Sequence, residues 1–496
     1  MLAPAPGNID THAYKDAGVN LAMGRGLTSV FTFGNPTFEP RFFAGYPPGF
    51  PLVYGAFGSL AGIGAEADTA FAVGSTAVLL FLSFLLLRPA FAQDRLALPI
   101  LGLLLLLTLP TRWMLLMDHR PDVVGLCLAL GALYFRPSTV GRAAGAALLA
   151  GLALAVSPIS GALAAGGIAV IWSLQSRPRP TLPVMVVVGL AGLLLPMGLA
   201  LLIGSAFDPH YVPRLLGYVG SVGPESAIGM TTGAGAFLKL LRGDPASWWM
   251  SFYDQGFTTP HAWARIALWV IALPLATHLL LRARPFVAGS IALALALLWG
   301  TGLFALVVVP WSKLYAAMAA GVLLCATVRA LPVDLWRATA ARWALLAGLG
   351  AMTAVQLPFG ALTTYSLANM TDSYERMNDV LAGLSFPDRT GDGRVVVQLD
   401  PFAYFLFKPR ALTIVPSPHP HASAPEIVQQ SDYVVLSFLG SGDPMTPHQP
   451  WWWETAAPEF ELLYRPALPQ QPQLFGYRLS NSSHTWEVEI WRRKAR

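Results

Sequence analysis

The chain has little charge and almost no cysteine, and both shortages narrow its class. Only 12% of its 496 residues are charged and 54% are hydrophobic, whereas water-soluble domains carry roughly 25% charged residues. The two cysteines, Cys127 and Cys325, lie inside apolar runs, so no disulfide framework is expected and both should behave as small buried hydrophobic side chains. This composition predicts a polytopic α-helical membrane protein.

Several catalytic signatures are also missing. The sequence has no H-E-x-x-H, C-x-x-C, Walker or G-x-S-x-G motif, so zinc protease, P-loop NTPase and serine hydrolase lack their usual signals. The net charge of +5 suits basic loops between membrane spans and indicates no nucleic-acid partner. Residues 1–49 hold no basic stretch followed by an apolar core, the pattern of a cleavable signal. Functional groups are therefore expected among the polar residues beside the apolar runs.

Apolar runs follow one another as far as residue 363 and predict about ten membrane spans. The predicted spans lie at residues 69–87, 96–111, 122–135, 143–156, 158–174, 182–204, 263–281, 286–309, 314–328 and 343–363. A shorter run at 51–62 covers only about 18 Å at 1.5 Å per residue, so it is expected to lie at the interface or to re-enter.

Arginines collect in alternate connections between these spans. The basic connections contain Arg88 and Arg95, Arg136 and Arg142, Arg177 and Arg179, Arg282 and Arg284, and Arg329, Arg337 and Arg342. Because positively charged loops stay in the cytoplasm, the pattern puts both termini outside.

The chain is expected to divide into three parts. Residues 1–68 form an extracytoplasmic or interfacial segment with juxtamembrane helices, and residues 69–363 form the transmembrane helical domain, including a glycine-rich outer loop at 205–262. Residues 364–496 form a soluble extracytoplasmic α/β domain. Its predicted strands lie at 394–399, 411–415, 433–439, 460–464, 475–479 and 486–491. The proline-rich stretch 416–425 is expected to be a loop.

The most distinctive polar stretch is Asp10-Thr-His-Ala-Tyr14. A helix is predicted there, capped by Asn8 or Asp10 and ended by Gly24 and Gly26. A carboxylate at the surface of a membrane domain costs free energy to place there, so Asp10 is a candidate catalytic residue. The alternative is that Asp10 serves only as the N-cap of the helix. His12 and Tyr14 are expected to orient neighbouring groups or to serve structure.

Positively charged residues also occur in a connection that is predicted to lie outside the cytoplasm, where few of them are expected. Arg112, His119 and Arg120 lie beside Asp118 and Asp122 in a predicted outer loop. Two arginines at the outer surface suit a phosphate of a lipid headgroup or a lipid-linked substrate. The alternative is that the two arginines pair with the two aspartates and hold helix ends together.

Lys313 is the second exception, at the outer end of another span and two residues before Tyr315. Its ammonium suits a phosphate, with the tyrosine hydroxyl as a neighbouring donor. The alternative is a lysine that extends from a helix end to the membrane surface.

Together these motifs resemble the membrane-embedded GT-C glycosyltransferases, in particular their bacterial PMT/ArnT-like branch. The similar stretches are Asp10–Tyr14, Tyr46–Leu52, Arg120-Pro-Asp122, Lys313-Leu-Tyr315 and, near the C-terminus, 395–401 and 431–436. Two features differ from the family. Tyr46 stands where some members have lysine, and no span precedes Asp10. Either the N-terminus is exported without a span, or a first span lies upstream and brings the total to about eleven.

The resemblance implies an inverting transfer of a sugar from a polyprenyl-phosphate donor to a glycan, lipid or protein acceptor. It implies Asp10 as the general base and Arg112, Arg120 and Lys313 as the groups that stabilise the leaving phosphate. Supporting roles fall to His12, Tyr14, Tyr46, Asp118, His119, Asp122 and Tyr315. The implied location is the bacterial inner membrane, with the site on the extracytoplasmic side.

Two other classes compete with the enzyme. A transporter or flippase for lipid-linked sugars would show inverted repeats and charge at mid-membrane, whereas here the charges collect at one face. A non-catalytic, membrane-anchored binding protein would not explain why Asp10 and the outer arginines are present. No cofactor is required by the sequence, and its acidic residues permit a divalent metal without demanding one.

Overall fold

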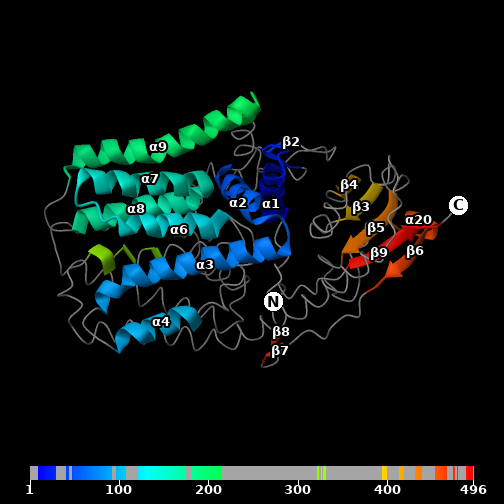
Figure 1. Cartoon of the computed structure of the whole chain (residues 1–496), viewed down its shortest axis with the longest axis horizontal. Coiled ribbons are helices and arrows are strands. Elements are labelled where there is room, and N and C mark those ends of the chain that lie inside the picture. The colour runs from blue at the N-terminus through cyan, green and yellow to red at the C-terminus, as the bar shows by residue number, and fades with distance from the viewer. Residues whose placement is uncertain are drawn as a thin grey trace, which may run out of the picture.

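The computed structural model describes part of the chain. The described residues are 9–29, 41–43, 47–91, 96–107, 121–174, 180–213, 321–322, 325–326, 328–330, 394–398, 413–417, 431–437, 453–465, 473–474, 477–478 and 488–494. Figure 1 shows the helices of the N-terminal half gathered at one end of the molecule and the larger sheet of the C-terminal part at the other.

The N-terminal segment forms a helix, a two-stranded ribbon and a second helix. Helix α1 covers Ile9–Ala22, strands β1 and β2 are Thr28–Ser29 and Arg41–Phe42, and helix α2 covers Gly49–Ala61. Two glycines after α1, Gly24 and Gly26, have φ of 73° and 75°, a conformation that only glycine adopts without strain. The predicted helix and its glycine ending are thus confirmed.

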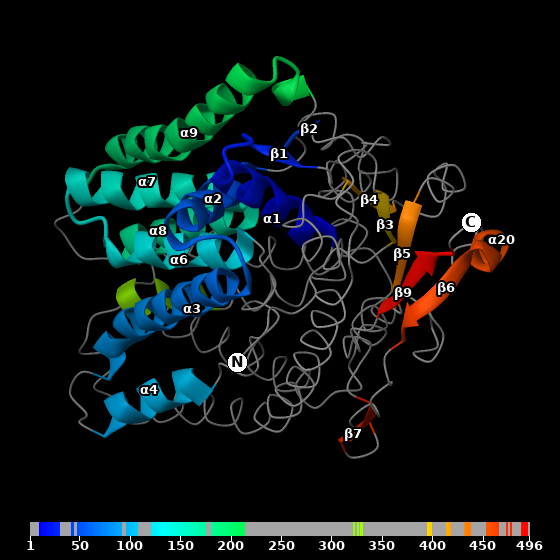
Figure 2. The ribbon, with the colours of Figure 1, turned by 45° about the vertical axis from the view of Figure 1, so that its right-hand side comes forward.

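Helices also occupy the first six predicted spans. They are α3 (Ala65–Leu87) with the short η1 (Arg88–Ala90), α4 (Ala97–Leu107), α6 (Pro121–Tyr134), α7 (Val140–Val156), α8 (Pro158–Leu174) and α9 (Leu182–Phe207). Figure 2 shows α6, α7 and α8 stacked between α3 and α9. A described part of residues 321–330 packs into the same bundle, where Val322, Cys325 and Ala326 are buried.

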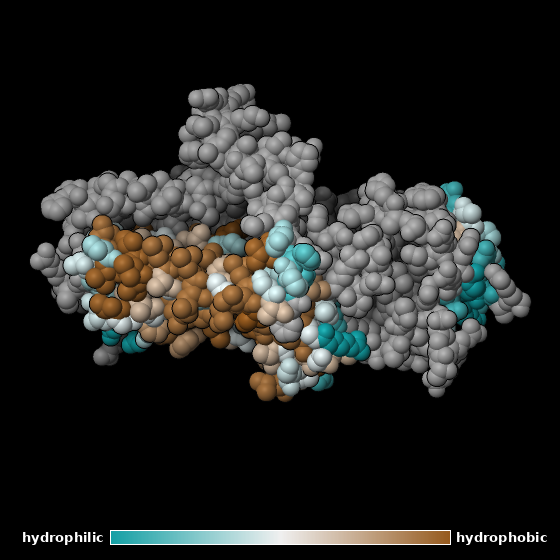
Figure 3. All heavy atoms as spheres, turned by 90° about the horizontal axis from the view of Figure 1, so that it is seen from above, coloured by the Kyte–Doolittle hydropathy of each residue, from teal (hydrophilic) through white to brown (hydrophobic). Residues whose placement is uncertain are grey.

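Two of the described helices are long and apolar enough to cross a membrane, Glu66–Ala90 and Leu182–Ala206. In the second helix, only 11% of the most apolar stretch is buried inside the molecule. Its exposed side chains include Val187, Leu195 and Leu202, and Figure 3 shows hydrophobic side chains across this face. Apolar surface of this extent is expected to contact lipid. The predicted number of spans extends beyond the described residues and stays a prediction.

The C-terminal part contains a five-stranded mixed sheet in the order β4-β3-β5-β9-β6. The strands are β3 (Arg394–Gln398), β4 (Thr413–Ser417), β5 (Ser431–Ser437), β6 (Phe460–Tyr464) and β9 (Val488–Arg493). Strand β3 pairs in parallel with β4 and β5, and β9 is antiparallel to β5 and β6. For each of these five strands, the first and the last residue both lie within two residues of the predicted ones. That this part is a separate extracytoplasmic domain stays a prediction.

One sequence prediction in this region was wrong. Pro416 was assigned to a loop but belongs to β4, opposite Val397. Strand β4 is at the edge of the sheet, where a residue without a backbone N–H is tolerated. Within the strand predicted at 475–479, the structure describes β8 (Tyr477–Arg478), which pairs antiparallel with β7 (Gln473–Leu474).

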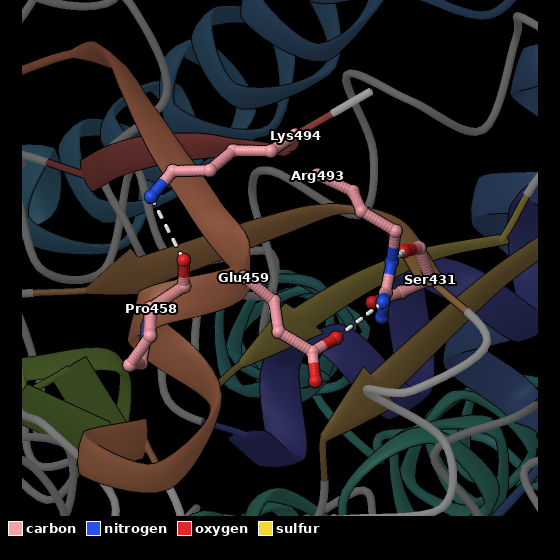
Figure 4. Close-up of polar contacts among 5 residues, drawn as sticks. All are labelled: Ser431, Pro458, Glu459, Arg493 and Lys494. Carbon is pink, nitrogen blue, oxygen red and sulfur yellow. Dashed lines mark hydrogen bonds and ion pairs between the residues drawn. The ribbon is translucent and has the colours of Figure 1, made fainter. Parts of the chain in front are cut away.

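The last strand is held to the helix α20 (Trp453–Ala456) and the turn η7 (Ala457–Glu459) that precede β6. Arg493 donates from Nη1 to Glu459 at 2.5 Å and from Nε to the Ser431 carbonyl at 2.9 Å. Lys494 donates to the Pro458 carbonyl at 2.8 Å, as Figure 4 shows. These bonds anchor β9 on both sides.

Candidate functional site

Helix α1, which carries the Asp10–Tyr14 motif, lies directly against α2. A Cβ on Gly18 would come within 2.6 Å of the Tyr54 ring, and one on Gly55 within 3.0 Å of the Gly18 carbonyl oxygen. The two backbones therefore approach as closely as glycine allows. The close approach fixes the position of α1 along α2.

A mainly aromatic group of buried side chains, here called the Tyr14 cluster, packs beside this helix contact. It contains Tyr14, Phe43, Phe50, Tyr54 and Val156, and Phe71 and Val124 pack against it. The Tyr14 ring centroid lies 5.6 Å from that of Phe43 and 5.9 Å from that of Phe50. Such tilted and edge-on pairs are the favourable geometry for aromatic rings. The cluster joins α1, α2 and the ends of α6 and α7.

A buried polar network lies beside this cluster. Lys15 Nζ donates to Asp68 Oδ2 at 2.5 Å, and the Tyr54 hydroxyl donates to the other carboxylate oxygen. The Lys15 and Asp68 side chains are only 10% and 6% exposed. Burial, and then the adjacent Asp68 charge, raise the pKa of Tyr54 well above its ordinary value, so its hydroxyl stays protonated and donates. The network joins α1 and α2 to the first turn of α3.

Asp122 lies at the start of α6 and is buried. The Ser157 hydroxyl donates to Asp122 Oδ1 at 3.4 Å, a long hydrogen bond between the beginning of α6 and the end of α7. Val124 and Val156, each close in sequence to one of these two residues, belong to or pack on the Tyr14 cluster. The structure therefore brings two predicted site residues, Tyr14 and Asp122, to the same end of the bundle.

The other predicted residues are described incompletely or lie outside the described residues. Asp10 and His12 belong to the first two turns of α1, but only their backbone is described. Outside the described residues are Tyr46, Arg112, Asp118, His119, Arg120, Lys313 and Tyr315. The roles implied for Asp10, Arg112, Arg120 and Lys313 therefore stay predictions.

The buried network was missed by sequence reasoning. Lys15 directly follows the motif, and Asp68 was taken as the last residue before a span, whereas α3 begins at Ala65 and includes it. A usable signal was present: a lysine and an aspartate isolated in apolar surroundings are costly to bury unless they pair. What the sequence lacked was the partner, 53 residues away.

The site offers no built metal centre where it is described. In the described part of the chain, no three His, Cys, Asp or Glu side chains lie close enough together to hold a metal ion. The Asp68 carboxylate is engaged by Lys15 and Tyr54.

No protein-family model matches the chain, and no curated protein does. Among solved structures, it is similar to ArnT from Cupriavidus metallidurans bound to undecaprenyl phosphate, at 14% identity and a TM-score of 0.48, over 99% of this chain and 94% of that one. It is also similar to the Archaeoglobus fulgidus oligosaccharyltransferase in complex with Zn and sulfate, at 15% identity and a TM-score of 0.47.

The second alignment covers 87% of this chain but only 64% of the oligosaccharyltransferase, so the chain spans less than two thirds of that protein. Both are GT-C glycosyltransferases, the superfamily that the sequence motifs resemble.

Proposed function

We propose that this chain is an inverting glycosyltransferase of the GT-C type, which transfers a sugar from a polyprenyl-phosphate donor to an extracytoplasmic glycan, lipid or protein acceptor. One observation supports this proposal above the others. The helix that carries Asp10 is held at one end of an apolar helical bundle by the Lys15–Asp68–Tyr54 network and the Tyr14 cluster. Such anchoring is what a helix needs in order to present a reactive group accurately.

In the proposed reaction, Asp10 accepts the proton of the acceptor hydroxyl. The hydroxyl oxygen then forms a bond to the anomeric carbon from the face opposite the donor phosphate, while the bond from that carbon to the phosphate oxygen breaks. The products are the inverted glycoside and the polyprenyl phosphate. Proton transfer by a positioned carboxylate contributes typically about 10²–10⁴-fold to such a rate.

Negative charge grows on the departing phosphate, and Arg112, Arg120 and Lys313 are proposed to stabilise it. Loss of one such contact costs on the order of 2–4 kcal/mol in the barrier. Asp122 is proposed to orient the neighbouring Arg120. Its burial beside Ser157 supports this role because a carboxylate held in one place can fix the direction of a guanidinium.

A lipid donor accounts for the location of the motif. The long helix α9 exposes a nearly continuous apolar surface, and the Asp10 helix stands at one end of the bundle to which α9 belongs. A polyprenyl chain in the bilayer would bring its phosphate to the membrane surface, where such an end would lie. We place this end on the extracytoplasmic side of the inner membrane, because the opposite ends of α6 and α7 carry the arginines.

The deciding experiment is the Asp10→Asn variant, purified in detergent and supplied with radiolabelled polyprenyl-phosphate sugars. Release or transfer of label should fall by about 10²–10⁴-fold. The matched control is Glu66→Gln, which removes one exposed carboxylate from the first turn of α3 and should leave the rate unchanged. Wild-type turnover by Asp10→Asn would end the assignment of the base. Passage of intact donor across vesicle membranes without release of sugar would instead favour a flippase.

A further inference from the structure

Three arginines lie near one another at the opposite end of α6 from Asp122, close enough that two of them act electrostatically on the third. They are Arg136, just after α6, Arg142, in the first turn of α7, and Arg329, from a segment nearly 200 residues further along the chain. Helix α6 has 14 residues, or about 21 Å at 1.5 Å per residue, so this group is remote from the proposed active site. Figure 2 shows residues 321–330 (yellow-green) beside α6 and α8.

Arg329 is tied to the end of α6 by two contacts. Its Nη2 donates to the Tyr134 carbonyl oxygen at 3.1 Å, and its guanidinium carbon lies 5.4 Å from the centre of the Tyr134 ring. These contacts hold the guanidinium where the last turn of α6 offers its carbonyl oxygens. The position of the Arg329 guanidinium is therefore fixed by the Tyr134 ring and by the Tyr134 carbonyl oxygen.

One donor in this arrangement is unsatisfied. Arg329 Nε is buried and has no hydrogen-bond partner. Burial, and then the nearby positive charges of Arg136 and Arg142, lower the pKa of Arg329. No carboxylate of the described residues forms an ion pair with any of the three arginines. An anion lying among these three like charges would reduce their mutual repulsion and could satisfy the buried Nε donor of Arg329.

From this juxtaposition we infer that Arg136, Arg142 and Arg329 form a binding site for the phosphate of an anionic membrane lipid, on the face opposite the proposed transfer site. Guanidinium groups suit phosphate because they donate two parallel hydrogen bonds to it. Anionic headgroups bind in basic pockets between helices at the cytoplasmic surface. The site is expected to hold this end of the bundle against the inner leaflet, separately from any donor phosphate.

Binding is measured by native mass spectrometry of the detergent-purified full chain, titrated with phosphatidylglycerol, with phosphatidylcholine, or with inorganic phosphate. Phosphatidylglycerol should bind in preference to phosphatidylcholine. The double variant Arg136→Gln/Arg142→Gln should weaken that binding about 25-fold, or about fivefold for each charge. Arg142 is exposed, and its guanidinium donates to the Ser138 hydroxyl at 3.4 Å. Its backbone N–H donates to the hydroxyl of Thr139, which caps α7, and glutamine retains that bond.

The matched control is Arg88→Gln, which removes an exposed arginine from a connection predicted to lie on the same side of the membrane. It should leave the affinity for phosphatidylglycerol unchanged. Equal weakening by the control and the double variant would show a general effect of surface charge and overturn the site. So would equal affinity for both lipids, and binding of inorganic phosphate alone would replace the lipid by a soluble anion. None of these readouts depends on sugar transfer.

Discussion

Replacement of Asp68 by asparagine should release α1 from the bundle. Asp68 accepts from Lys15 at 2.5 Å and from the Tyr54 hydroxyl, and both members of the ion pair are nearly fully buried. The substitution keeps the size of the side chain and removes its charge. It therefore leaves the Lys15 ammonium in the same buried position without the carboxylate that compensates it.

The size of the effect follows from that burial. Loss of one partner of a buried ion pair costs about 3–5 kcal/mol, because the remaining charge stays desolvated. Tyr54→Phe should cost less, about 1.5–3 kcal/mol, since it removes one hydrogen bond to a charged group and retains the ring. The triple variant Lys15→Met/Tyr54→Phe/Asp68→Leu removes every polar member of the network. It should cost less than Asp68→Asn alone, because it removes both members of the Lys15–Asp68 ion pair and leaves neither of these two charges behind.

These differences are measured as apparent melting temperatures in detergent, together with hydrogen exchange of the α1 amides. Asp68→Asn should give the lowest melting temperature and the fastest exchange in α1. Glu66→Gln removes a negative charge from the same helix turn but an exposed one, so it corrects for the loss of interaction with the helix dipole. A triple variant as unstable as the summed single variants, or an Asp68→Asn protein as stable as the control, would refute the reasoning.

Two further predictions use matched pairs within the chain. Gly49→Ala should destabilise by about 1–3 kcal/mol, because its Cβ would lie 2.5 Å from a backbone oxygen of α7, whereas Gly74→Ala meets open space and should stabilise α3 by up to about 1 kcal/mol. In the sheet, Arg465→Met should markedly speed hydrogen exchange in β9, because its partner Glu489 is fully buried. Arg492→Met should leave that exchange unchanged, because both members of its ion pair are about half exposed. Thermal denaturation checks the glycine pair, and either pair behaving alike would contradict the packing described.

Local signals in the sequence predicted the local structure well. The helix of residues 9–22, its end at Gly24, and the helices of the first six predicted spans follow from apolar composition, length and helix-ending residues, which act within a few positions. Strand β6 at Phe460–Tyr464 was predicted to the residue. Pro416 was misassigned because its position at a sheet edge is not a local property.

The candidate site was predictable only in part. The motif around Asp10 stands out because a carboxylate and two aromatic or imidazole groups are unusual before a hydrophobic run. Lys15 was passed over, because in sequence it is one more polar residue on a short helix, and only its contact with Asp68 shows that it is buried. Likewise, Arg329 is one basic residue in one loop until it is placed against Tyr134.

The sequence by itself determined the helical character of the chain and the positions of its first helical segments, because the low charge content and the apolar runs depend only on composition and order. Only the tertiary structure decided which of these charges share a neighbourhood. Lys15 meets Asp68 across 53 positions, and Arg329 meets Tyr134 across 195. Such pairings arise from helix packing, in which close contacts at glycine and aromatic side chains select one arrangement among many that the same local pattern permits.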